Sequence, residues 1–132
     1  MFKFTVSLIL MIFMSNLNAQ INKDLLQKKA PSEFENIFVE KLAEDNLSST
    51  FLIWIKNRVP LHKHLEHSES VYVLEGTGLL QLADSAFEVK AGSYIFIPKN
   101  TPHSVKVTSE APLKVLSVQS PRFDGSDKIN LE

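Results

Sequence analysis

The stretch PLHKHLEHSESVYVLEG, residues 60–76, contains three of the four histidines of the chain within six positions. His62 and His64 are two residues apart, so their side chains would point to the same face of a β-strand. The polar segment that follows indicates a bend before the apolar run VYVLEG. A strand–turn–strand unit of this kind would direct His62, His64 and Glu69 into one cavity.

The fourth histidine, His103, lies in PKNTPHSV, just after an apolar run that ends at Pro98. Imidazole and carboxylate ligands together suit Zn, Fe, Mn, Ni or Cu, and a site with few protein ligands leaves positions open for a substrate. An H-x-H pair on a polar hairpin is also common by chance. The spacing alone therefore leaves both a metal site and a cluster of surface histidines open.

The rest of the chain favours an all-β fold. Short apolar or alternating runs rich in Val, Ile, Phe and Tyr recur between Gly, Pro, Asn, Asp and Ser residues, as expected for strands and turns. With no long helical period between them, these runs predict an antiparallel sandwich or small barrel. The runs are ENIFVEKL, STFLIWIK, SVYVLEG, GLLQLAD, AFEVKAG, SYIFIP, HSVKVT and LKVLSVQS. We interpret EGTG, residues 75–78, as a tight hairpin turn.

Length and composition set the remaining limits. The 132 residues, 44% of them hydrophobic, suffice for one compact domain. The net charge is −1 and no basic run occurs, so we expect no nucleic-acid partner. The chain has no Cys, which excludes disulfides, thiolate ligands and a Cys nucleophile.

The N-terminus is typical of an export signal. In MFKFTVSLILMIFMSNLNAQ, Lys3 precedes an apolar run that ends at Met14, and a short polar stretch ends at Ala19. The run is far shorter than the ~20 residues that span a bilayer. We expect residues 1–19 to be a signal peptide, with no membrane span after its cleavage and with a periplasmic or extracellular location. A polar segment (20–33), a barrel (34–120) and a C-terminal tail (121–132) would follow.

The wider pattern resembles the cupin superfamily. The first motif begins with the H-x-H pair His62 and His64, with Glu69 after four further residues and Gly76 after six more. A short spacer separates it from a second motif, which contains Gly92, Pro98 and His103. These paired motifs are similar to those of small single-domain bacterial cupins. The resemblance implies a double-stranded β-helix, or jelly-roll, barrel. It also implies that His62, His64, Glu69 and His103 bind one divalent transition metal (Fe, Mn, Ni, Zn or Cu).

Three positions depart from the usual pattern. Lys56 and Asn100 stand where Gly is usual, and Val107 replaces a frequent Asn. Asn tolerates the left-handed conformation that such a turn requires. None of the three is a ligand position, so the departures weaken the link to a subfamily and leave the site intact.

Function remains open between two classes at this stage. An enzyme of the dioxygenase or isomerase/lyase type, acting on a small polar metabolite, is favoured; the alternative is a non-catalytic cupin that binds a small ligand or metal. The resemblance also makes a homodimer a candidate, with ENIFVEKL as the pairing segment. We expect His67 to be an exposed loop residue; the alternative is a group that supports the metal ligands or an acid/base at the cavity mouth. We expect Arg122 and Phe123 to belong to an ordinary polar tail, unless they fold over the barrel mouth and meet an anionic or ring-shaped substrate.

Overall fold

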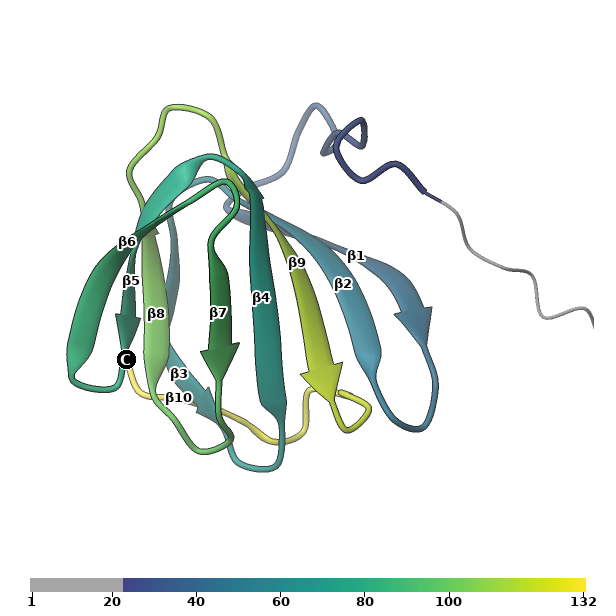
Figure 1. The fold of residues 1–132 in the computed structure, drawn as a ribbon, viewed down its shortest axis with the longest axis vertical. Helices are drawn as coiled ribbons and strands as arrows, with labels where there is room; N and C mark the ends of the chain where they lie inside the picture. Colours follow the sequence, from purple (N-terminus) through teal and green to yellow (C-terminus); the bar gives the residue numbers. More distant parts are fainter. Residues whose placement is uncertain (1–22) are drawn as a thin grey trace, which may run out of the picture.

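The computed structural model of the protein describes residues 23–132, and the expected signal peptide lies outside this range. The described residues form ten β-strands in two five-stranded antiparallel sheets (Figure 1). Residues 23–132 contain no helix of the length and apolarity that crossing a membrane requires. The predicted all-β jelly-roll fold is therefore confirmed.

The two sheets face each other across the core. The first sheet has the order β1 (Ile37–Glu44), β2 (Ser49–Ile55), β9 (Leu113–Ser120), β4 (Ser68–Glu75) and β7 (Tyr94–Ile97). The second has the order β10 (Lys128–Asn130), β3 (Arg58–His64), β8 (His103–Val107), β5 (Thr77–Leu82) and β6 (Ser85–Lys90). All eight runs that the sequence marks as strands form strands, and β3 carries His62 and His64.

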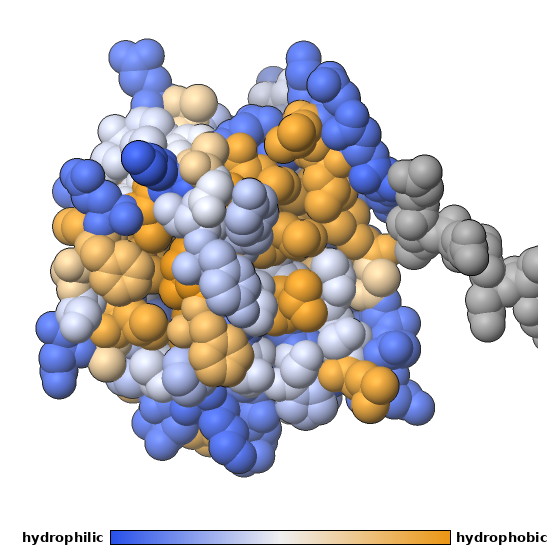
Figure 2. Space-filling model, in the orientation of Figure 1, coloured by the Kyte–Doolittle hydropathy of each residue, from blue (hydrophilic) through white to orange (hydrophobic). Residues whose placement is uncertain are grey.

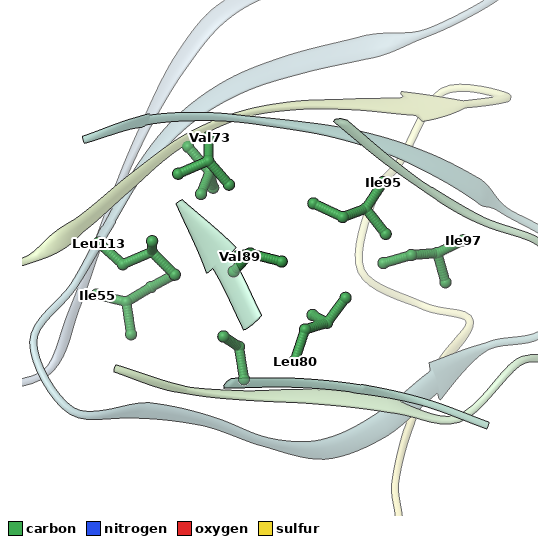
Figure 3. Close-up of a cluster of buried hydrophobic side chains, with 9 residues drawn as sticks. Ile55, Val73, Leu80, Val89, Ile95, Ile97 and Leu113 are labelled. Atoms are coloured by element: carbon green, nitrogen blue, oxygen red, sulfur yellow. The ribbon is translucent and has the colours of Figure 1, made fainter. Parts of the chain in front are cut away.

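The core lies between the sheets, as strand alternation requires. On β4, for example, Val73 is 1% exposed whereas its neighbour Tyr72 is 42% exposed. Aliphatic side chains from both sheets converge on this space (Figure 3). Burial of each such side chain stabilises the fold by about 1.5–3 kcal/mol. The buried cluster is Ile55, Val73, Leu80, Val89, Ile95, Ile97, Val105, Leu113 and Val115.

The chain crosses from one sheet to the other at Gly76, so the predicted hairpin at residues 75–78 is wrong. β4 pairs with β7 and β9, whereas β5 pairs with β6 and β8. Gly76 has φ +79°, and a Cβ there would lie 2.8 Å from the carbonyl oxygen of Pro112. Glycine at position 76 therefore allows the chain to cross between the sheets while its backbone passes close to that of Pro112. Asn100 adopts the left-handed conformation expected of it, with φ 60°.

The outer face of the first sheet is partly covered by the N-terminal segment. Lys114 is fully buried there, and its Nζ donates to the carbonyl oxygen of Leu26 (3.2 Å) and to Glu75 Oε1 (2.9 Å). Farther along the same face Tyr94 and Phe96 are 64% and 51% exposed. Figure 2 shows apolar and polar residues side by side on this face. Tyr94 and Phe96 therefore lie on the outer face of the sheet, away from the core.

The C-terminal tail returns across one end of the barrel. After β9 it runs below β4 and ends as β10 beside β3 (Figure 1). In this pairing Lys128 lies opposite His64 and Asn130 opposite His62. The tail is therefore part of the second sheet, at the end where the histidines gather.

Candidate metal centre

Three histidines meet at one end of the space between the sheets. His62 and His64 project from β3, and His103 begins β8, where it lies opposite His62 in the strand pairing. One ring nitrogen from each of the three lies within 4.8 Å of the others. All three side chains are buried, with 5–6% of their surface exposed. The alternation of β3 brings His62 and His64 to the same face, as predicted.

Hydrogen bonds on the outer side of two of the rings, those of His62 and His103, turn the other nitrogen inward. His62 Nδ1 lies 2.8 Å from the carbonyl oxygen of Pro60, and His103 Nδ1 lies 2.9 Å from that of Thr101. A carbonyl oxygen only accepts, so each Nδ1 carries the proton and donates it. The Nε2 lone pairs of His62 and His103 are then free, and His103 Nε2 is buried without a hydrogen-bond partner in the described part of the chain.

The carboxyl group of Glu69 lies beside two of the three histidines. Its Oε2 is 3.6 Å from His103 Nε2 and 4.0 Å from His64 Nε2, while its Oε1 accepts a hydrogen bond of 2.6 Å from Ser117 Oγ. Glu69 is 8% exposed. The group of ligand atoms that all lie within 4.8 Å of one another contains only the three histidines. Glu69 therefore lies at the edge of this group.

The charges of these groups suit a cation. Burial, followed by the charge of the neighbouring His103, lowers the pKa of His62 to about 4. Burial also lowers the pKa of His64. For Glu69, burial alone would raise the pKa, but interactions that include the hydrogen bond from the Ser117 hydroxyl hold it below its usual value.

At neutral pH the site therefore combines the neutral imidazoles of His62 and His64 with a buried carboxylate. No Lys or Arg nitrogen lies within 4.0 Å of Glu69 among residues 23–132. A buried charge of this kind is costly unless it is paired or coordinates a metal. The donor set of imidazole nitrogens and carboxylate oxygens fits a divalent transition metal.

His67 is buried, so the expectation of an exposed loop residue is wrong. Only 6% of its surface is exposed. Its Nδ1 hydrogen-bonds to Asp127 Oδ2, and its Nε2 lies 2.8 Å from the carbonyl oxygen of Arg122. Burial lowers the pKa of His67, but these oxygen atoms raise it more, and the net shift is upward. His67 thus anchors the tail to the turn between β3 and β4.

The tail places Phe123, and not Arg122, over the histidine end of the barrel. Arg122 pairs with Glu44 on the surface, with Nη2 to Oε1 at 3.0 Å. The ring of Phe123 lies edge-on to those of His64 and His67, 5.1 Å from each centroid. The tail is therefore a structural part of the site.

A cavity of about 250 Å³ extends from the histidines into the barrel. Its lining includes His62, His64, Glu69 and His103, and its walls are otherwise largely aliphatic. Gln119 also lines it, and its amide oxygen is buried without a hydrogen-bond partner in the described chain. A concave, mostly apolar pocket with a few convergent polar groups is typical of a small-molecule site.

Several residues of the site have no motif in the sequence. Ser117 and Gln119 follow the alternation of β9 and could have been placed on its inner face, although nothing marks them as functional. Phe123 and Asp127 lie in the tail, and their contacts with β3 and the turn after it span about 60 residues. No local signal in the sequence indicates such contacts.

Comparisons with known proteins agree with this fold. A model of the cupin domain matches residues 51–119. An uncharacterized protein of Aquifex aeolicus is 37% identical over 107 residues, which is 81% of this chain and 88% of its own length. The chain therefore belongs to the cupin family, as the motifs in its sequence indicated.

Two solved structures illustrate the shared fold. A protein of Klebsiella pneumoniae with a double-stranded β-helix domain has a TM-score of 0.72 at 15% identity, covering 86% of this chain and 99% of its own. The nucleoside dehydratase Pac13 has a TM-score of 0.68 at 15% identity, covering 86% and 92%; Streptomyces Pac13 has also been solved with uridine. At this identity the likeness concerns the fold alone.

Proposed function

We propose that the protein is a metal-dependent cupin enzyme in which His62, His64, His103 and Glu69 bind one divalent transition metal. One observation carries the proposal: the Nδ1 atoms of His62 and His103 are held by backbone carbonyl oxygens, so their Nε2 atoms are left to converge beside a buried carboxylate. Histidine ligands are commonly oriented in this way by the hydrogen bond of the second nitrogen.

A metal bound there would act as a Lewis acid on a carbonyl or hydroxyl oxygen, or would hold a substrate next to O₂. The residues of the chain supply orientation and a water-poor environment. Ser117 holds Glu69 through its hydrogen bond to Oε1, and the free amide oxygen of Gln119 can accept a hydrogen bond from a ligand. Dioxygenase and isomerase/lyase reactions both fit such a site, and the activity named for Pac13 belongs to the second kind.

A non-catalytic binding protein is the second candidate, and one observation favours it. Besides the four proposed ligands, the cavity lining offers a single titratable side chain, Lys128, in the described part of the chain. An enzyme that moves protons needs an acid or base within hydrogen-bond reach of the substrate. Loss of turnover in a Lys128→Met variant that still binds ligand would favour the enzyme.

Elemental analysis tests the proposed metal site. The protein would be purified from its natural compartment without a His tag and measured by ICP-MS. Near-stoichiometric Fe or Cu would support the site and favour O₂ chemistry, whereas Zn would favour isomerase or lyase chemistry. A protein that stays metal-free after incubation with each of Fe, Mn, Ni, Zn and Cu would contradict the proposal.

We also propose that residues 1–19 direct export to the periplasm or beyond. The short apolar run after Lys3 supports this proposal. Intact-mass measurement of the protein from its source cells should give a chain that begins at Gln20. A retained Met1 in the exported fraction would contradict signal cleavage.

A homodimer paired through β1 is a further part of the proposal. β1 is an edge strand of the first sheet, and it carries Ile37 and Val39 at 38% and 49% exposure. An edge strand with apolar side chains is open to pairing with another chain. Light scattering should give twice the monomer mass for the wild type, and a Val39→Lys variant should be monomeric.

A further inference from the structure

The cavity is divided into a polar end and an apolar body. In the first sheet Glu69 of β4 lies opposite Gln119 of β9, and in the second sheet His62 lies opposite His103. Farther along the same strands, Val73 lies opposite Val115 and Leu80 opposite Val105. Polar and aliphatic side chains therefore form separate layers of one cavity.

The apolar lining continues from the body of the cavity to the surface. Ile37 and Val39 of β1 line the cavity and are also partly exposed. In the pairing of the first sheet they lie beside Ile55 and Ile53. A ligand whose polar group reaches the histidines therefore has aliphatic side chains along the rest of its length.

The charges at the polar end favour an anionic group. A metal takes imidazole ligands in their neutral form, so the three imidazoles, the Glu69 carboxylate and a divalent cation would together carry a net charge of +1. Lys128, which also lines the cavity, lies opposite His64 in the pairing of β10 with β3 and adds a second positive charge.

We infer that the ligand is a small amphipathic carboxylate, with its carboxylate at the metal end and a hydrocarbon body between the aliphatic walls. This inference rests on the proposed metal site and narrows the ligand class. It differs from the small polar metabolite favoured by the sequence, because polar groups placed against the aliphatic walls would lose their hydrogen bonds to water. The cavity volume of about 250 Å³ equals that of about eight water molecules at ~30 Å³ each, so a short carboxylate lies within it and a longer hydrocarbon chain extends toward the partly exposed Ile37 and Val39.

A chain-length series tests the inference. The protein is first loaded with Zn²⁺ and its metal content measured. Acetate, butanoate and octanoate are then titrated into it by calorimetry. Each buried methylene should raise the affinity by up to about fourfold, and octanoate should bind at least about tenfold more tightly than acetate.

Two matched variants locate the binding. Val115→Phe places a ring inside the cavity, whereas Val118→Phe places the same ring on the opposite face of β9. Octanoate affinity should fall at least about tenfold in V115F and stay within about twofold of wild type in V118F. Methyl NMR of the wild-type protein should show octanoate-induced shifts at Val73 and Val105, and this measurement does not depend on V115F folding.

The outcomes separate the two proposals. If the protein binds Zn²⁺ but has equal affinities for acetate and octanoate, the inference of an amphipathic ligand is wrong and the proposed metal site is still supported. Octanoate that perturbs only surface methyl groups would also overturn it. If no Zn²⁺ is bound in the first step, the proposed metal site is wrong. The placement of the ligand's carboxylate at that end of the cavity is then wrong as well.

Discussion

Asp127 lies against His64, with Oδ1 of the carboxylate 3.5 Å from Nδ1 of the imidazole. Its other oxygen, Oδ2, accepts hydrogen bonds from the backbone N–H groups of Glu66 (2.9 Å) and His67 (3.1 Å). A carboxylate in this position favours the His64 tautomer with its proton on Nδ1 and leaves Nε2 free. Asp127 Oδ1 and His64 Nδ1 form no hydrogen bond at this distance, so the tail acts on His64 through the carboxylate charge, whereas backbone carbonyl oxygens accept hydrogen bonds from His62 and His103.

This relationship makes Asp127 a positioning residue for the proposed metal. We expect Asp127→Asn to weaken Zn²⁺ binding about 10- to 100-fold, because the amide still accepts from the backbone but lacks the carboxylate charge. Competition with a coloured chelator measures the affinity. Asp124→Asn, in the same tail segment, is the control and should change it less than about twofold. Equal affinities of a folded D127N variant and the wild type would rule out this role.

Phe123 should contribute to stability through the end of the barrel that it covers. Its ring is edge-on to Phe51 at 6.2 Å and to His64 at 5.1 Å. Because Phe123 is only partly buried, we expect Phe123→Ala to lower the free energy of unfolding by about 2 kcal/mol, less than the ~3–5 kcal/mol of a fully buried Phe. Urea denaturation measures this change. Phe96→Ala, at an exposed aromatic, should cost less than about 1 kcal/mol; equal losses in both variants would contradict the packing role of Phe123.

The ion pairs of Glu44 should make stability depend on pH in the acid range. Hydrogen bonds from Lys41, then Arg122 and Ser49, lower the pKa of Glu44 from 4.5 to about 2. A carboxyl group with a depressed folded-state pKa stabilises the fold above its unfolded value, and this contribution is lost as pH falls toward the folded value. The stability difference between wild type and Glu44→Gln should therefore shrink between pH 4.5 and 2.

Urea midpoints at pH 6, 4 and 2.5 provide the measurement for Glu44. Glu110→Gln is the control, since Glu110 is exposed and forms no ion pair in the described residues. A difference between wild type and E44Q that is the same at all three pH values would contradict the assignment.

The strands and the histidine cluster could be predicted because they follow from local patterns. Alternation places His62 and His64 on one face of β3, and apolar runs bounded by turn residues mark the strands. The spacing from His62 to His103 resembles the cupin motifs, which identified the fold. These signals depend on neighbouring residues and on fixed intervals along the chain.

The contacts of the tail could not be predicted in the same way. β10 has three residues, all exposed, so it shows no apolar alternation. His67 lies in a polar turn that would be exposed if the tail did not fold back over it, and Asp127 approaches it from 60 residues away. The hairpin predicted at EGTG failed because strand pairing, not the turn residues, decides whether β4 and β5 are neighbours.

Zinc content of a single pair of variants tests the proposed metal centre most directly. His64→Ala removes one proposed ligand, while Lys63→Ala changes the adjacent residue on the opposite face of β3. Each protein, without a His tag, is loaded with Zn²⁺, desalted and measured by ICP-MS. We expect about one zinc ion per chain in the wild type and in K63A, and little in H64A. An H64A variant that retains as much zinc as the wild type would contradict the account.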